Sequence, residues 1–172
     1  MKNLALDMWF GHCSVRFFAS LRSAQNDSSC RGNMVNIVIV SHGDLGDALL
    51  RTTEMIAGPT ERLFSVSLLP DESPEGLEDK LSTVLREIED EETLVLVDMP
   101  GGTPYSVVAP HVSQANVECV TGVNLPMLLE LVTSRDGALA KLADVATRAG
   151  QETIKNVGPM LDEWKRQTLS KN

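Results

Sequence analysis

Long apolar runs, clustered basic residues and paired cysteines are all missing from this chain of 172 residues. No run reaches the roughly 18 apolar residues that a membrane-spanning helix needs. Lys and Arg number 15 against 24 Asp and Glu, a net charge of -9, so we expect no nucleic-acid partner. Cys13, Cys30 and Cys119 show no metal or redox spacing, which favours a reducing, cytoplasmic location and no metal site.

Nucleotide-binding motifs are missing as well. Neither the G-x-x-x-x-G-K-[ST] of a P-loop nor the G-x-G-x-x-G of a dinucleotide site occurs. The chain has two Trp, one Tyr and four Phe, and only Tyr105 lies near the loops that we single out below. A flavin would therefore find little to stack on, and we expect no cofactor.

The first 33 residues differ in composition from the rest. Four basic and two acidic residues give them a charge of +2, whereas residues 34–172 carry 11 basic and 22 acidic residues. An acid-poor, Arg- and Ser-bearing segment is also typical of a transit peptide. Because Met34 directly precedes a strand-like run, we predict a non-functional extension over 1–33 and one domain over 34–172.

Short apolar runs alternate with helical patterns from Met34 onwards. The runs end in Gly- and polar-rich loops. Helices capped by Asp44 and Ser73 are expected, and two more should start at Thr103-Pro104 and at Pro126. Pro110 should kink the third helix, and Gly150 should end a helix over 136–149. The predicted strands are 35–41, 63–69, 93–98 and 117–121, with an edge strand over 151–157 and a helical tail after it.

This alternation predicts an α/β fold: a doubly wound, mainly parallel four-stranded sheet with helices on both faces. Ligands in such sheets bind beyond the carboxyl ends of the strands, where the strand order switches. The rule selects three loops, over residues 41–44, 98–104 and 121–126. These are also the loops richest in glycine and polar residues, so topology and composition point to the same edge.

A histidine and a carboxylate lie at that edge. His42 follows the first strand, and a neutral imidazole is a good nucleophile when a partner fixes its tautomer. Asp98 ends the third strand and would be that partner if the two strands are neighbours. Alternatively, His42 is only a turn residue and Asp98 a strand-ending acid.

The neighbouring loops supply candidate phosphate ligands. Gly101, Gly102 and Thr103 precede Pro104 and can present backbone N–H groups to a phosphate-like anion. A bare Gly-Gly is also compatible with a plain connection. Because the loops hold no Lys or Arg, one phosphoryl group fits better than a polyphosphate. The remaining predicted site-lining residues are Ser41, Gly43 and Asn124.

The segments IVIVSHGDLGDALLRTTEMIAG, LVLVDMPGGTPYS and TGVNLPMLLELV resemble the IIA domain of the mannose-type, phosphoenolpyruvate-dependent sugar phosphotransferase system. The resemblance implies that His42 takes phosphate from the histidine phosphocarrier protein and that Asp98 orients it. The phosphate would pass to a separate IIB component serving a membrane permease, with the hydroxyl of Thr103 in the site. It also implies a homodimer that exchanges the edge strand. Pro100 departs from the pattern, since many relatives have a bulky residue there.

Three other functions remain open at this point. A receiver-like domain would carry phosphate on Asp98, but it would need paired acids after the first strand. A flavodoxin-type binding module would need loop aromatics. The phosphocarrier of dihydroxyacetone kinase uses the same kind of site, although the GVNLP loop favours the sugar branch. The sequence does not identify the sugar.

Overall fold

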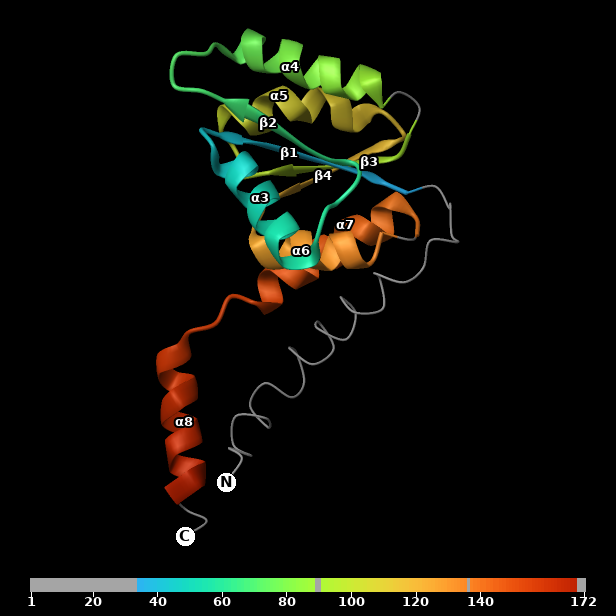
Figure 1. Cartoon of the computed structure of the whole chain (residues 1–172). Helices are drawn as coiled ribbons and strands as arrows, with labels where there is room; N and C mark the ends of the chain where they lie inside the picture. The colour runs from blue at the N-terminus through green and yellow to red at the C-terminus, as the bar shows by residue number, and fades with distance from the viewer. Residues whose placement is uncertain (1–33, 89–90, 136, 170–172) are drawn as a thin grey trace.

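The computed structural model describes residues 34–88, 91–135 and 137–169, and the predicted extension over 1–33 lies outside these ranges. Figure 1 shows strands and helices alternating along the described chain. The strands are β1 (Asn36–His42), β2 (Leu63–Leu68), β3 (Thr93–Val97) and β4 (Val117–Thr121). The helices are α3 (Leu45–Ala57), α4 (Pro74–Glu87), α5 (Thr103–Val108), the 3-10 helix η1 (Ala109–Ser113), α6 (Leu125–Thr133), α7 (Leu139–Glu152) and α8 (Val157–Leu169).

The four strands form one sheet in the order β2-β1-β3-β4, and every pair is parallel. Val38 of β1 lies opposite Phe64 of β2 and Val95 of β3. Strands buried on both faces read as continuous apolar, β-branched runs, which is why β1 and β3 were recognisable in the sequence. The predicted α/β sheet is therefore confirmed.

Two hydrophobic cores lie on opposite faces of the sheet. Because side chains alternate along a strand, Ile37 and Ile39 enter one core while Val38 and Val40 enter the other. Figure 1 shows α3, α6 and α7 on the first face and α4 and α5 on the second. All four of these β1 side chains are almost fully buried, so β1 and the residue that ends it are held rigidly.

Prolines and caps set the helix bounds near the predicted positions. The side chain of Ser73 accepts a hydrogen bond from the backbone N–H of Gly76 at 3.2 Å and begins α4. After Val108 the α-helix stops, and Pro110 lies in the 3-10 turn that follows. Where the sequence predicted a kink, the helix changes from α to 3-10, because proline has no N–H for an α-helical hydrogen bond.

The predicted C-terminal edge strand is wrong for this structure. Helix α7 continues through Gly150 to Glu152, a turn follows at Thr153, and Val157 already begins α8. Gly150 is buried inside α7 rather than ending it. It is glycine because a Cβ there would lie 2.7 Å from Cε of Met127 and 2.9 Å from Nδ2 of Asn124.

Candidate functional site

His42 and Asp98 meet at the topological switch point of the sheet, between β1 and β3. From β1 the chain crosses by α3 to β2 on one side, whereas β3 leads by α5 to β4 on the other side. The loops after β1 and β3 therefore diverge, and the carboxyl ends of these two neighbouring strands bound the crevice between them. His42 is the last residue of β1 and Asp98 directly follows β3.

The carboxylate of Asp98 is held on both of its oxygens. Oδ2 lies 2.7 Å from Nδ1 of His42 and accepts the backbone N–H of His42 at 2.9 Å. Oδ1 accepts the backbone N–H of Met99 at 2.8 Å. The Asp98 side chain is only 10% exposed, against 45% for His42. The carboxylate of Asp98 is thus held in place and shielded from water, whereas the imidazole of His42 is accessible.

Burial raises the pKa of Asp98, but hydrogen bonds from the backbone and ring of His42 and from the backbone of Met99 lower it more. The net pKa lies below the ordinary value of an aspartic acid. Asp98 is therefore ionised at neutral pH and can only accept hydrogen bonds. The proton of a neutral His42 ring must then sit on Nδ1, which leaves the lone pair on Nε2.

The Gly-Gly loop approaches the imidazole closely. A Cβ at Gly102 would lie 2.9 Å from Cε1 and 3.6 Å from Nε2 of His42. Gly101 has φ +78, a left-handed conformation that favours glycine. Thr103 begins α5 and is half-buried. The structure thus brings Gly102 to the ring that the sequence analysis singled out.

The other predicted lining residues have hydrogen-bonding roles in the scaffold. The buried hydroxyl of Ser41 accepts the backbone N–H of Gly46 at 2.9 Å. Gly43 has φ +56, and its N–H donates to the carbonyl of Leu68 at 2.8 Å. Both residues therefore fix the chain on either side of His42. Their part in catalysis stays a prediction.

Asn124 caps α6 in the loop after β4. Its Oδ1 accepts the backbone N–H of Met127 at 3.1 Å, and its Nδ2 donates to the carbonyl of Gly122 at 3.2 Å. These bonds set the loop at the same sheet edge, because the N–H of Gly122 donates to Val97, the residue before Asp98. A direct contact between Asn124 and a phosphoryl group stays a prediction.

Sequence reasoning missed two groups near the site. It assigned the cap of α3 to Asp44, whose side chain makes no capping bond, whereas Ser41 supplies the oxygen. It also missed the backbone N–H of Met99, which holds the second oxygen of Asp98. The serine directly before His42, at the end of an apolar run, was the available signal for the cap. Nothing in the sequence marks the backbone N–H of Met99.

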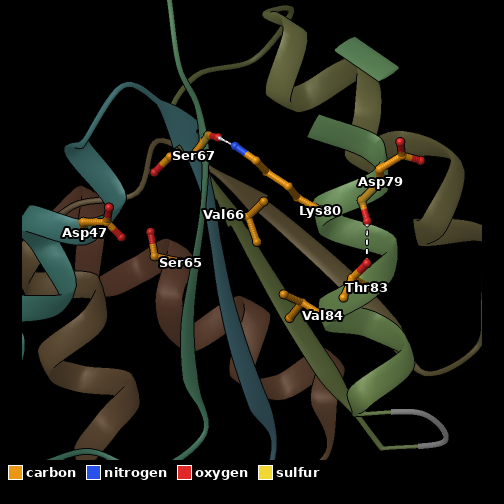
Figure 2. A pocket seen from close by; sticks show the side chains of 8 residues that line it. All are labelled: Asp47, Ser65, Val66, Ser67, Asp79, Lys80, Thr83 and Val84. Carbon is orange, nitrogen blue, oxygen red and sulfur yellow. Dashed lines mark hydrogen bonds between the residues drawn. The ribbon is translucent and has the colours of Figure 1, made fainter. Parts of the chain in front are cut away.

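An open hollow of about 550 Å³ lies elsewhere, along the outer edge of β2 (Figure 2). Lys80 crosses it and donates to the carbonyl of Ser67 at 3.2 Å, and it also pairs with Glu72. A lysine over a sheet edge discourages pairing with another strand. Neither His42 nor Asp98 lines the hollow; its residues are Asp47, Ser65, Val66, Ser67, Asp79, Lys80, Thr83 and Val84.

Residues 34–88, 91–135 and 137–169 contain no group of three or more His, Cys, Asp or Glu side chains placed to hold a metal ion. Among their helices, none combines the length and the apolar character needed to cross a membrane.

Comparison with known proteins identifies the family of the chain. The family model EIIA-man, described as the fructose IIA component of the phosphotransferase system, matches residues 36–149. The chain belongs to this family. The EIIA-man match includes His42, Asp98 and the Gly-Gly loop, and it ends before α8.

Individual relatives of this EIIA-man chain support the same family. The fructose-specific EIIA component of Bacillus subtilis (strain 168) is 36% identical over 135 residues, 77% of this chain and 92% of that protein. The mannose-specific EIIAB component of Escherichia coli (strain K12) is 33% identical over 125 residues, 70% of this chain, but the chain spans only 39% of that longer protein. The solved mannose/sorbose specific IIA subunit from Enterococcus faecalis is 30% identical, with a TM-score of 0.69, over 72% of this chain and 94% of that one.

The resemblance found in the sequence is thus confirmed. This EIIA-man chain is a mannose-type IIA component of the sugar phosphotransferase system, and it takes the transferase-type role that such components have in sugar transport.

Proposed function

We propose that this IIA component carries a phosphoryl group on His42. The group comes from the histidine phosphocarrier protein and passes to a separate IIB component that serves a sugar permease. The observation that supports this role is the 2.7 Å contact between Nδ1 of His42 and the ionised Asp98, which leaves Nε2 free on an exposed ring.

The loading step follows from this tautomer. The Nε2 lone pair of His42 attacks the phosphorus of the donor's phosphohistidine, and the donor's P–N bond breaks as the new P–N bond forms. The donor imidazole leaves as a neutral ring with the proton on its other nitrogen. His42 keeps its Nδ1 proton, so the phosphorylated ring is positively charged and lies against the negative Asp98. Transfer to IIB is the same step in reverse, with the IIB acceptor in place of the donor.

The Gly-Gly loop is proposed to receive the phosphoryl oxygens. Gly102 is the residue whose Cβ position lies 3.6 Å from Nε2, so its lack of a side chain leaves room beside the reacting nitrogen. Backbone N–H groups of Gly101 and Gly102 and the hydroxyl of Thr103 are the donors that this loop offers. Such donors act best where charge develops during transfer.

Exposed apolar side chains around the site favour a protein as donor and acceptor. Leu69 follows β2, Met99 follows Asp98, Tyr105 lies on α5 and Leu45 begins α3; each is 40% to 52% exposed. Met and aromatic residues are enriched in the centres of protein interfaces. A carrier that must meet two different partners needs an accessible histidine and such a surface.

The alternatives are less well supported. Asp98 would be a poor phosphoryl acceptor, because both of its oxygens accept hydrogen bonds from His42 and Met99. Relatives that match this chain include components named as specific for fructose, mannose and sorbose, which favours the sugar branch over a dihydroxyacetone-kinase phosphocarrier. A cytoplasmic location and a homodimer are also part of this proposal.

Phosphorylation of histidine variants tests the proposal. His42→Ala should abolish labelling from the phosphorylated carrier protein. The melting temperature should fall by no more than several degrees, because the variant loses the hydrogen bond of the ring to Asp98 but little burial. The matched control is His111→Ala, which removes an imidazole paired with Glu78 at 2.9 Å on another part of the molecule. Label on His42→Ala, or label stable in acid and lost in base, would contradict phosphohistidine at this position.

A further inference from the structure

The outer edge of β2 presents main-chain groups that no other strand of the described chain uses. β2 is the end strand of the sheet and pairs with β1 alone. The N–H of Gly43 donates to the carbonyl of Leu68, and alternate residues of a strand point their main-chain groups to the same side. The main-chain groups of Ser65 and Ser67 therefore point away from β1, into the hollow along β2.

Most of these outward groups have no partner in the described ranges. Lys80 donates to the carbonyl of Ser67 at 3.2 Å, but the N–H groups of Ser65 and Ser67 and the carbonyl of Ser65 make no hydrogen bond there. The hydroxyl oxygens of both serines are buried and also lack a partner. Donors and acceptors that follow one another along a sheet edge are complementary to the main chain of an extended peptide.

The wall of the hollow on the α3 side is acidic and lined with hydroxyls. Because side chains alternate along β2, Ser65 and Ser67 face α3, and Oγ of Ser65 lies 2.6 Å from the Cβ position of Gly46. Asp47 of α3 lies on the same side of β2 as Ser65 (Figure 2). Asp47 makes no ion pair within the described part of the chain. This wall therefore suits a basic side chain.

The wall on the α4 side is partly apolar. Val66 belongs to the second hydrophobic core, and Val84 packs against that core while it also lines the hollow. Figure 2 shows Val84 and Lys80 on this side of β2. Lys80 also pairs with Glu72, and a lysine over an edge keeps unsuitable strands away. A strand that pairs here must displace the Lys80 ammonium group from the carbonyl of Ser67.

We propose that the hollow along β2 receives an extended segment of another protein in which basic and apolar residues alternate. The main chain of the segment pairs with Ser65 and Ser67 as an added strand. Its basic side chains face Asp47 and the serine hydroxyls, and its apolar side chains face Val66 and Val84. The proposal goes beyond phosphate transfer and does not depend on it.

Charge selects a different protein over a second copy of this chain. Residues 34–172 carry 11 basic and 22 acidic residues, so two copies repel each other. β2 has the sequence LFSVSL, and the β2 strand of a second copy would bring no base to Asp47. A basic segment is instead attracted by the acidic chain, which also speeds its association at low salt.

Titration of the ¹⁵N-labelled full chain with the peptide acetyl-Lys-Val-Lys-Val-Lys-amide, followed by NMR, tests the site. The amide signals of Ser65 and Ser67 should shift, and acetyl-Glu-Val-Glu-Val-Glu-amide should leave them in place. Asp47→Asn should weaken binding by about 1.5- to 5-fold. The control Asp144→Asn removes an equal charge from an exposed position of α7 and should bind as the wild type does.

Two further variants separate binding from folding. Lys80→Met should tighten binding by about 2- to 10-fold, because the peptide no longer competes with the ammonium group for the carbonyl of Ser67. Ser65→Ala should weaken binding without lowering the melting temperature, because its hydroxyl has no partner in the free chain. A lower melting temperature with unchanged binding in Ser65→Ala would mean a structural role and would overturn the proposal.

Two N-methylated peptides test the main-chain pairing. One carries the methyl groups on its two valines and the other on two of its lysines. Alternate residues of an added strand face β2, so one of the two peptides should lose binding and the other should keep it. Equal affinity of the two would overturn the proposal, as would unchanged signals of Ser65 and Ser67 at millimolar peptide. Shifts of these signals on concentrating the chain alone would place a second copy at the edge and would also refute it. Normal phosphorylation in any of these cases would leave the role of His42 standing.

Discussion

Gly102→Ala is the sharpest test of the geometry around His42. The added methyl group would lie 2.9 Å from Cε1 of His42, closer than carbon atoms normally approach. The ring cannot move freely, because its Nδ1 lies 2.7 Å from Oδ2 of Asp98. Relief of the clash by about 0.5 Å or more would stretch this contact towards the limit of a hydrogen bond.

The expected loss of transfer rate follows from the strength of the hydrogen bond that is stretched. A hydrogen bond to a charged group contributes about 1.5 to 3 kcal/mol, which corresponds to about 10- to 150-fold in rate. Single-turnover transfer from the phosphorylated carrier protein should slow by that factor in Gly102→Ala. The melting temperature should also fall by several degrees, because the stretched bond contributes to the stability of the folded domain as well.

A control separates the clash from a general effect of replacing glycine. Gly76→Ala adds a methyl group in α4 at 3.9 Å from Oγ of Ser73, which is an ordinary contact. This variant should transfer phosphate at the normal rate. If Gly102→Ala were equally fast while still folded, the close approach of the Gly-Gly loop to His42 would have no part in the reaction.

Three further predictions concern the support of the site and the chain before it. Asp98→Asn should slow transfer by about 10²–10⁴-fold, and a normal transfer rate would reject the orienting role. Because the pKa of Asp98 is lowered in the folded state, the ionised carboxylate stabilises the fold fully above the unfolded-state pKa, and this stabilisation is lost as the pH falls through the folded-state pKa. Asp98→Asn should therefore also show a smaller loss of stability on acidification than the wild type. Ser41→Ala should lower the free energy of unfolding by about 1–3 kcal/mol, because the N–H of Gly46 loses its buried acceptor, and an unchanged denaturation midpoint would mean that water or another group replaces it. A chain starting at Met34 should keep both its melting temperature and its phosphate acceptance, whereas a large drop in melting temperature would show that residues 1–33 pack on the domain.

The sheet and the central pair of the site could be predicted because their signals are local. β1 and β3 are short β-branched runs that suit burial on both faces. His42 and Asp98 end these runs, and the carboxyl ends of neighbouring parallel strands lie at the same edge. That β1 and β3 are neighbours was an assumption, which the pairing of Val38 with Val95 now confirms.

The C-terminal part could not be predicted in the same way, because its signals are ambiguous. Ile154 and Val157 lie three residues apart, a spacing that fits a helix at least as well as a strand. Val157 in fact opens the helical spacing that continues to Trp164. Gly150 looked like a helix end, since a capping glycine and one that allows close packing are identical in sequence.

Gly150 has a consequence for how distant parts of the molecule influence each other. It lets the last turn of α7 lie against Asn124, whose loop is hydrogen-bonded through Gly122 to Val97, the residue before Asp98. The end of α7 is also the point from which the chain leaves towards α8. A side chain at position 150 would therefore press first on Asn124 and Met127, and through the loop after β4 on the edge of the sheet that holds His42 and Asp98.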